Sequence, residues 1–248
     1  MLAVNNLMVF FENALALNGL TLEVREGEIV GLIGSNSAGK TTLMNAVSGL
    51  IIDMRIKEMR RGGQRISVYG DITYNGEDIT ETPPEWRVKN GIVLSRERHP
   101  IFPESSVLEN FRIAGYLRTK KEIRDVVDYV FTLFPPLVKL QKRKAGFLSG
   151  GEQQMLAIGM ALVVQPKLLL LDEPLLGLSP MMQKAVMNAI VALNKESGIT
   201  VLLSEQFARP VLPVVDRAYV VENGMLTLSG TGADLMNNPE IKSAYFGV

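Results

Sequence analysis

The amino-acid sequence predicts an α/β fold in which a parallel core sheet carries an N-terminal antiparallel β layer and a helical insertion. A short apolar run, Ile29–Ile33, leads through a glycine-rich loop into a helical pattern, as in the βα unit of a parallel sheet. Four consecutive leucines, Leu168–Leu171, are typical of a strand buried on both faces. Mainly helical periodicity from about Pro103 to Leu162 indicates the insertion.

Length and composition set the class of protein. The chain has 248 residues, enough for one large α/β domain or two small ones. Lys and Arg total 26 and Asp and Glu total 26, so no global field favours nucleic acid and no such partner is expected. The absence of cysteine excludes disulfides, thiolate metal sites and a cysteine nucleophile.

The hydropathy pattern predicts a soluble, cytoplasmic protein. The N-terminus lacks the basic start and the uninterrupted apolar run of a signal peptide. No apolar stretch reaches the roughly 18 uncharged residues that a spanning helix needs. We therefore expect any association with a membrane to pass through a partner or a surface.

The first elements follow from periodicity and from glycine positions. Strands are expected at Ala3–Phe11 and Leu20–Arg25. A helix is expected from about Gly39 to Ser48, and Gly49 is a natural helix stop.

A basic segment, 51–65, separates this helix from the next β pattern. A solvated loop or helix face is its simpler interpretation, and contact with anionic lipid or a partner loop is the alternative. Residues 65–79 then alternate apolar and polar, with turn signals at Gly70 and at Asn75-Gly76, which predicts an antiparallel hairpin. Further on, strands are expected at 168–171, 200–204 and 218–221, with a helix over 180–196.

The glycine-rich loop fits the phosphate-loop pattern G-x-x-x-x-G-K-[ST]. Its glycines permit unusual dihedrals and close approach, so that backbone N–H groups can surround a polyphosphate at a helix N-terminus. Lys40 is expected to reach the outer phosphates, and the Thr41 hydroxyl to bind Mg²⁺. The residues expected to bind nucleotide here are Gly34, Ser35, Asn36, Ser37, Ala38, Gly39, Lys40, Thr41 and Thr42. Ser37 stands where glycine is more usual.

Two carboxylates follow the leucine strand. Ligands of open α/β sheets gather at the carboxyl ends of strands, where Asp172 is placed to hold Mg²⁺ directly or through water. Glu173 is placed to orient or deprotonate an attacking water. A strand ending in a solvated acidic turn is the alternative, and the upstream phosphate loop disfavours it.

A second anion-binding helix start lies between these two sites. Residues 148–154 read LSGGEQQ, and helical periodicity begins just after them. One nucleotide needs only one such site per chain, so a second copy could bring this helix end to the first copy's nucleotide. The residues expected to contribute are Ser149, Gly150, Gly151 and Glu152.

The order GSNSAGKTT, LSGGEQQ, LLLLDEP resembles the nucleotide-binding subunit of ATP-binding cassette (ABC) transporters, over essentially the whole chain. The resemblance implies a single ABC ATPase domain, 1–248, with a P-loop NTPase core and a helical subdomain near 100–165. It also implies ATP and Mg²⁺ as ligands, membrane permease subunits as partners, and a head-to-tail dimer with a second ABC ATPase subunit. In that family the LSGGE segment completes the site of the opposite subunit.

Other positions are carried over from the family one at a time. Phe11, or alternatively Phe10, is expected to stack on adenine, although either could be ordinary core. Glu97 stands where the family has the glutamine that touches Mg²⁺ and the membrane partner. Gln206 takes the place of the family's switch histidine, and the lone histidine, His99, is expected in an exposed loop. Because a glutamine cannot carry charge, catalysis should rest mainly on Glu173.

These departures resemble one branch of the family, the importers of branched-chain amino acids and related amides, and within it the second ATPase subunit. That implies a solute-binding protein as an indirect partner and a peripheral position on the inner membrane face. Two alternatives remain: a soluble ABC ATPase of DNA repair or translation, and a nucleotide-gated regulatory module that does not hydrolyse. A P-loop kinase is weaker, because LSGGE would have no role in it.

Overall fold

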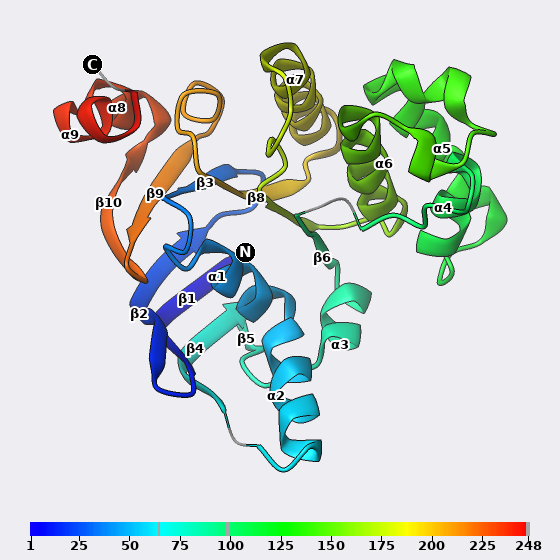
Figure 1. Cartoon of the computed structure of the whole chain (residues 1–248). Helices are drawn as coiled ribbons and strands as arrows, with labels where there is room; N and C mark the ends of the chain where they lie inside the picture. The colour runs from blue at the N-terminus through cyan, green and yellow to red at the C-terminus, as the bar shows by residue number, and fades with distance from the viewer. Residues whose placement is uncertain (64, 98–99, 247–248) are drawn as a thin grey trace.

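The computed structural model describes residues 1–63, 65–97 and 100–246, and these form two sheets flanked by helices (Figure 1). The six-stranded sheet has the order β10-β9-β3-β8-β7-β6, in which only β10 runs antiparallel to its neighbour. Its strands are β3 (Ile29–Ile33), β6 (Ile92–Ser95), β7 (Leu168–Asp172), β8 (Thr200–Glu205), β9 (Arg217–Glu222) and β10 (Met225–Thr231). The antiparallel sheet has the order β2-β1-β4-β5, from β1 (Leu2–Phe11), β2 (Ala14–Val24), β4 (Ile66–Tyr74) and β5 (Glu77–Asp78). The predicted fold class is confirmed.

The helices fall into groups around these sheets (Figure 1). α4, α5 and α6 gather in a lobe at one end of the core sheet, whereas α1 and α2 lie beside the antiparallel sheet. The helices are α1 (Lys40–Ser48), α2 (Leu50–Arg60), α3 (Pro84–Lys89), α4 (Val107–Ala114), α5 (Lys120–Leu133), α6 (Gly150–Val163), α7 (Pro180–Ser197), α8 (Gly232–Asn237) and α9 (Pro239–Ile241). Short 3₁₀ turns, η1 (Pro135–Leu140) and η2 (Ala145–Phe147), join α5 to α6. Within the described part of the chain, none of these helices is both long and apolar enough to cross a membrane.

The core sheet is buried on both faces, which explains the run of leucines in β7. Leu168 and Leu170 pack in one apolar cluster with α1 and the antiparallel sheet. Leu169 and Leu171 point the other way, into a second cluster with α6 and α7. Burying each such side chain stabilises the fold by about 1.5–3 kcal/mol relative to exposing it. A strand with this requirement on both faces has no room for polar alternation.

The strand register brings the phosphate loop, the acidic turn and Gln206 to the same end of the core sheet, where the parallel strands have their carboxyl ends. Ile33 of β3 pairs with Glu205 of β8, and Asp172 of β7 pairs with Ser204 of β8. Since these strands are parallel, the phosphate loop after β3 and the acidic turn after β7 leave the sheet at the same end, on either side of β8. Gln206, the next residue after β8, leaves between them.

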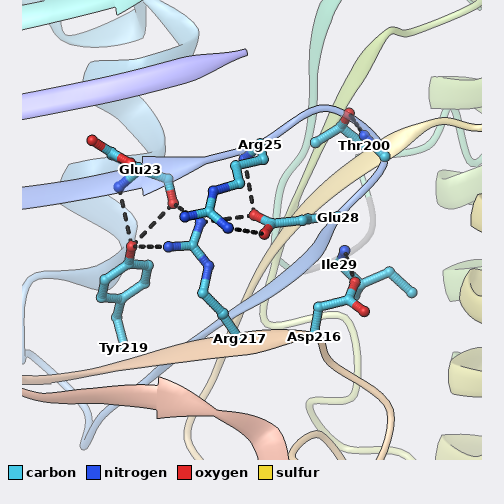
Figure 2. Close-up of polar contacts among 9 residues, drawn as sticks. Glu23, Arg25, Glu28, Ile29, Thr200, Asp216, Arg217 and Tyr219 are labelled. Carbon is cyan, nitrogen blue, oxygen red and sulfur yellow. Dashed lines mark hydrogen bonds and ion pairs between the residues drawn. The ribbon is translucent and has the colours of Figure 1, made fainter.

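A polar network ties the two sheets together at the opposite edge (Figure 2). The Arg217 guanidinium of β9 donates to the Glu28 carboxylate at 2.7 Å and to the Glu23 carbonyl oxygen of β2 at 3.0 Å. The Tyr219 hydroxyl accepts from the Glu23 N–H at 3.2 Å and donates to its carbonyl oxygen at 3.1 Å. Asp216 accepts from the Ile29 N–H at 2.8 Å. The turn between β2 and β3 is therefore fixed to the core sheet by two side chains of β9 and by Asp216, the residue before it.

Three local expectations are corrected or completed. Gly70 is not a turn: it lies inside β4, opposite a bulge in β1, where two β1 residues stand against Gly70 between the pairs Asn5–Asp71 and Met8–Tyr69. The predicted hairpin turn at Asn75-Gly76 is confirmed, with φ of 52° and 84°, between β4 and β5. Residues 51–60 of the basic segment lie in α2, which is the helix form of the simpler interpretation, with an exposed Asp53–Lys57 ion pair on the helix surface.

Candidate functional site

The phosphate loop connects β3 to α1, and two of its glycines are sterically required. A Cβ on Gly34 would collide with the Val221 carbonyl oxygen of β9. Gly39 has a φ of 108°, and its Cβ would lie 2.8 Å from the Ala16 carbonyl oxygen. Only glycine fits either position without displacing backbone, so the loop is held against β2 and β9 in a fixed shape.

The middle of the loop is open to solvent. Ser35, Asn36 and Ser37 are exposed, whereas Ala38 is buried and its carbonyl oxygen accepts from the Gly224 N–H at 2.9 Å. Ser37 adopts a left-handed φ of 64°, so this non-glycine residue occupies the conformation that glycine adopts most readily. An exposed arch before a helix N-terminus is a surface suited to a polyphosphate.

Lys40 is the most constrained cation at the loop. Its ammonium donates to the carbonyl oxygens of Gly34 at 2.8 Å and Ser35 at 2.9 Å. It also pairs with the Glu173 carboxylate at 3.1 Å, and the side chain is only 3% exposed. Three partners fix the three donors of the ammonium group, so its positive charge is held at the loop and beside the acidic turn.

Asp172 and Thr41 form an oxygen-rich pair across the sheet edge. The Thr41 hydroxyl donates to Asp172 Oδ1 at 3.3 Å, and the Ser204 hydroxyl donates to the same oxygen at 2.6 Å. Burial raises the pKa of Asp172, with Glu173 and Glu97 adding to the rise, while the Ser204 and Thr41 hydroxyls oppose it. A buried carboxylate in such surroundings is stabilised by a nearby cation.

This donor set fits Mg²⁺. Mg²⁺ prefers oxygen ligands and keeps several waters, binding through one or two protein groups plus substrate phosphates. Among the described residues no cluster of three His, Cys, Asp or Glu side chains could hold a metal on its own. One hydroxyl and one carboxylate beside a phosphate loop match the Mg²⁺ pattern rather than that of an all-protein cage.

Glu173 is held in an unusual conformation. Its φ is 48°, left-handed for a non-glycine residue, and its N–H donates to the Ser204 carbonyl oxygen at 3.1 Å, with the Ser204 hydroxyl also at 3.1 Å. Such conformations cost of order 1–3 kcal/mol and cluster at functional sites. The carboxyl group lies at Lys40, 10% exposed, so the turn presents it to the phosphate loop.

Sequence reasoning overlooked Glu205. This side chain is 2% exposed, and its carboxyl oxygen accepts from the Leu175 N–H at 2.7 Å. Burial raises its pKa to about 8, with the charge of Glu173 adding to the rise, while hydrogen bonds from the Leu175 and Gln206 backbone and the charge of Lys40 oppose it. The only signal in the sequence was a charged residue at the end of an apolar strand.

The remaining candidates lie around this centre. Gln206 is half buried directly after β8, and Glu97 is half buried after β6, near enough to Asp172 to influence its pKa. Both are therefore on the same sheet edge as the loop. His99 lies outside the described residues, as does its neighbour Arg98.

The LSGGE segment starts α6 in the helical lobe (Figure 1). The Ser149 hydroxyl accepts from the Glu152 N–H at 3.4 Å, and the Glu152 carboxylate accepts from the Ser149 N–H at 2.8 Å. This reciprocal capping box satisfies two N–H groups of the helix start. Ser149 and Gly150 are exposed, so this helix end faces solvent on a different part of the chain from α1.

The two candidate aromatics point to different places. Phe11 is half buried and lines a pocket on α2, together with Met54 and Ile66. Phe10 packs edge-on against Tyr69, with ring centroids 6.1 Å apart. Phe11 thus has an accessible face in a hollow, whereas Phe10 is engaged by a neighbouring ring.

Comparison with known proteins gives a consistent result. The profile of a family described as "ABC transporter" matches residues 17–176. Over its full length the chain is 39% identical to the full length of BraG of Pseudomonas aeruginosa, a high-affinity branched-chain amino acid transport ATP-binding protein. It is 33% identical to LivG of Salmonella typhimurium, described in the same words, with 100% of the chain and 98% of the relative covered.

Solved structures show the same similarity in three dimensions. A nucleotide-free ATP-binding cassette from an ABC transporter superposes with a TM-score of 0.81 at 26% identity, covering 97% of this chain and 96% of that one. An ATP-binding cassette of an ABC transporter in its ADP conformation gives a TM-score of 0.79 at 27% identity, covering 100% and 99%.

Proposed function

This chain belongs to the ABC transporter family, whose ATPases hydrolyse ATP to drive transport, and we propose that it powers the uptake of branched-chain amino acids or related small solutes. The observation that carries the solute class is end-to-end similarity to relatives named for branched-chain amino acid transport. Its resemblance to the second ATPase subunit of such importers rests on Glu97 and Gln206 together with the sequence features IFP followed by V-x-E-N, GLSP and a terminal A-Y-F-G.

In the proposed site, the loop 34–42 binds the phosphates of ATP through its backbone N–H groups. Lys40 neutralises the outer phosphates, for which its ammonium is already fixed beside the loop. Thr41 and Asp172 would hold Mg²⁺, with Glu97 as an additional oxygen donor. Bound Mg²⁺ would supply charge neutralisation for the terminal phosphates. Phe11, open to a pocket, is the proposed adenine-stacking residue.

Glu173 is the proposed general base. Its carboxylate would orient and deprotonate the attacking water, in line with the γ-phosphate. Its pairing with Lys40 at 3.1 Å supports this, because the ammonium marks where the outer phosphates belong. Gln206 would donate a hydrogen bond to the γ-phosphate without carrying charge.

We further propose that the site is shared between two subunits. The solvent-facing helix start at 149–152 would complete the site of a second ABC ATPase subunit, in a head-to-tail dimer. The full chain 1–248 would act as one ABC ATPase domain with a helical subdomain near 100–165. Permease subunits would hold it at the inner face of the cell membrane, and a solute-binding protein would act through them.

The solute is tested by reconstitution. The chain is co-purified with its permease subunits, placed in proteoliposomes and supplied with candidate solute-binding proteins. Stimulation of ATP hydrolysis by leucine, isoleucine or valine, together with uptake of the labelled amino acid, is the expected result. Co-purification with no permease would favour a soluble ABC ATPase, and nucleotide binding without phosphate release would favour a regulatory module.

The base is tested with Glu173→Gln. We expect this variant to bind ATP as tightly as the wild type does, and to dimerise when ATP is bound. Glutamine has the size of glutamate, and its amide oxygen can still accept a hydrogen bond from Lys40. Its turnover should fall by about 10²–10³-fold, since the amide cannot accept the proton. Phosphate release and ATP affinity are measured on the same preparation. Turnover at the wild-type rate would remove Glu173 from this role.

A further inference from the structure

Glu205 is a buried acid at the centre of the sheet edge to which the hydrolysis scheme above gives no task. It is the last residue of β8, 2% exposed, and lies between Ser204, which contacts Asp172, and Gln206. Burying a carboxyl group costs free energy unless hydrogen bonds from its surroundings compensate for the lost water. Its contacts therefore indicate what it does.

The turn after β7 is held by two adjacent residues of β8. The Glu173 N–H donates to Ser204, and the Leu175 N–H donates to Glu205 Oε1 at 2.7 Å. Pro174, between them, has no N–H. Both backbone donors of this three-residue turn are thus satisfied by β8, one on each side of the proline.

Glu205 also contacts the phosphate loop. Its carbonyl oxygen accepts from the Gly34 N–H at 3.2 Å, at the point where β3 becomes the loop. Leu175 is itself buried, so its N–H has no access to solvent. A single residue thereby links the first residue of the loop to the turn that carries Glu173.

We propose that Glu205 is a positioning residue for ATP hydrolysis, which fixes the Glu173 turn against the phosphate loop through its acceptor oxygen on the Leu175 N–H. The inference rests on the proposed role of Glu173. Its physical basis is that Glu173 sits in a left-handed conformation, which persists only where surrounding bonds hold it. Without this acceptor, the Leu175 N–H would be left buried and unsatisfied, and the turn would relax away from Lys40.

The acceptor oxygen, and not the negative charge, is the part that matters. Burial raises the pKa of Glu205 to about 8, so the group is mostly neutral near neutral pH. Glutamine matches the neutral acid in size and keeps a carbonyl oxygen for the Leu175 N–H. Methionine matches the length but offers no comparable acceptor. Comparing Glu205→Gln with Glu205→Met therefore distinguishes a positioning role of the acceptor oxygen from a role in filling space.

Thr200 provides a matched control at the other end of the same strand. It is fully buried, and its hydroxyl accepts from the Gly27 N–H at 2.9 Å, far from the loop. Thr200→Val therefore removes a β8 side-chain acceptor from a backbone N–H that lies outside the strand, as Glu205→Met does. If Glu205 only stabilised the fold, the two substitutions should have the same effect on kcat.

The experiment measures kcat and KM for Mg·ATP on the full-length chain, or on the chain assembled with its permease. Glu205→Gln should keep kcat within about threefold, whereas Glu205→Met should lose about thirtyfold or more in kcat with KM changed less than about threefold. Thr200→Val should keep kcat within about twofold, even where its Tm falls. Hydrogen exchange at the Leu175 amide should accelerate in Glu205→Met alone.

If Glu205→Met does not fold, Glu205→Asp replaces it, since the shorter side chain withdraws the acceptor but remains polar. Its kcat should fall by about tenfold or more. A wild-type kcat in the Met or Asp variant, or a loss in Glu205→Gln as large as in Met, would overturn the proposal. Glu173→Gln is assayed in parallel: wild-type turnover there removes the base assignment, whereas the Leu175 exchange rate still reports on Glu205.

Discussion

Glu205 should make a measurable contribution to the pH dependence of the free energy of unfolding. Its folded pKa is about 8, raised mainly by burial, against an ordinary value of 4.5. The unfolded chain therefore releases this proton at lower pH than the folded protein. The free energy of unfolding then falls as pH rises from about 4.5 to about 8, at up to about 1.4 kcal/mol per pH unit.

Glu205→Gln removes this term, because an amide does not titrate. The free energy of unfolding of the variant should therefore gain on that of the wild type by about 1 kcal/mol per pH unit between about pH 5.5 and 7.5. Urea titrations of both proteins at several pH values, without nucleotide or Mg²⁺, give the difference. Asp172 is present in both proteins, so its contribution to the pH dependence largely cancels in this difference. A difference that stays constant with pH would contradict the burial of an ionisable group here.

Individual site residues could be predicted where the residues next to them in the sequence form a recognisable pattern. Lys40 and Thr41 are marked by the glycines before them, and Asp172 by the leucines before it. Glu205 has no such marker, since its role depends on the Leu175 N–H, which lies 30 residues away in sequence. A long-range hydrogen bond between a side chain and a loop backbone leaves no periodic signal.

Among the elements, α1 has an unusual C-terminal cap. Arg87 of α3 is fully buried, and its guanidinium donates to the Ala46 and Val47 carbonyl oxygens at the end of α1, at 2.6 and 2.8 Å. It also donates to carbonyl oxygens of Ile79, Thr80 and Thr82. Burial lowers its pKa to about 10, still well above neutrality. The charge complements the negative end of the helix that begins at the phosphate loop.

Removing this cap should be costly. In Arg87→Met several buried carbonyl oxygens lose their donor, and we expect the free energy of unfolding to fall by at least about 3 kcal/mol. Lys57→Met, which breaks an exposed ion pair with Asp53 on α2, should cost less than about 0.5 kcal/mol. Urea unfolding of the two variants is the measurement. Equal losses would show that Arg87 is not the cap that its hydrogen bonds describe.

Element prediction succeeded for the central apolar strands and missed one short strand and one edge strand. The expected strands at 29–33, 168–171 and 200–204 are central and apolar, and the structure contains them all. β6 (Ile92–Ser95) is only four residues long, and β10 (Met225–Thr231) is an edge strand that alternates exposed and half-buried residues, so neither stood out. Gly70 gave a turn signal, but a glycine inside a strand equally marks a bulge.

For the whole molecule, the two sheets share one apolar cluster. Val4 and Leu7 of β1 pack with Val30 of β3 and Leu202 of β8 in the same cluster. Trp86, the chain's single tryptophan, packs against that cluster from α3. The antiparallel layer therefore has no separate core, and it should unfold together with the core sheet.

The network in Figure 2 tests this coupling. Tyr219→Phe removes a hydroxyl that bonds both backbone groups of Glu23 on β2, and it should cost about 1–2 kcal/mol, because the Glu23 N–H loses its acceptor. Since the sheets unfold together, Trp86 fluorescence and far-ultraviolet circular dichroism should give coincident urea transitions in both proteins, displaced equally by the substitution. ATP turnover should be unchanged, as the network lies at the amino ends of β3 and β8, away from the phosphate loop. A fluorescence transition that moved alone would show instead that the antiparallel layer separates from the core before the rest of the chain unfolds.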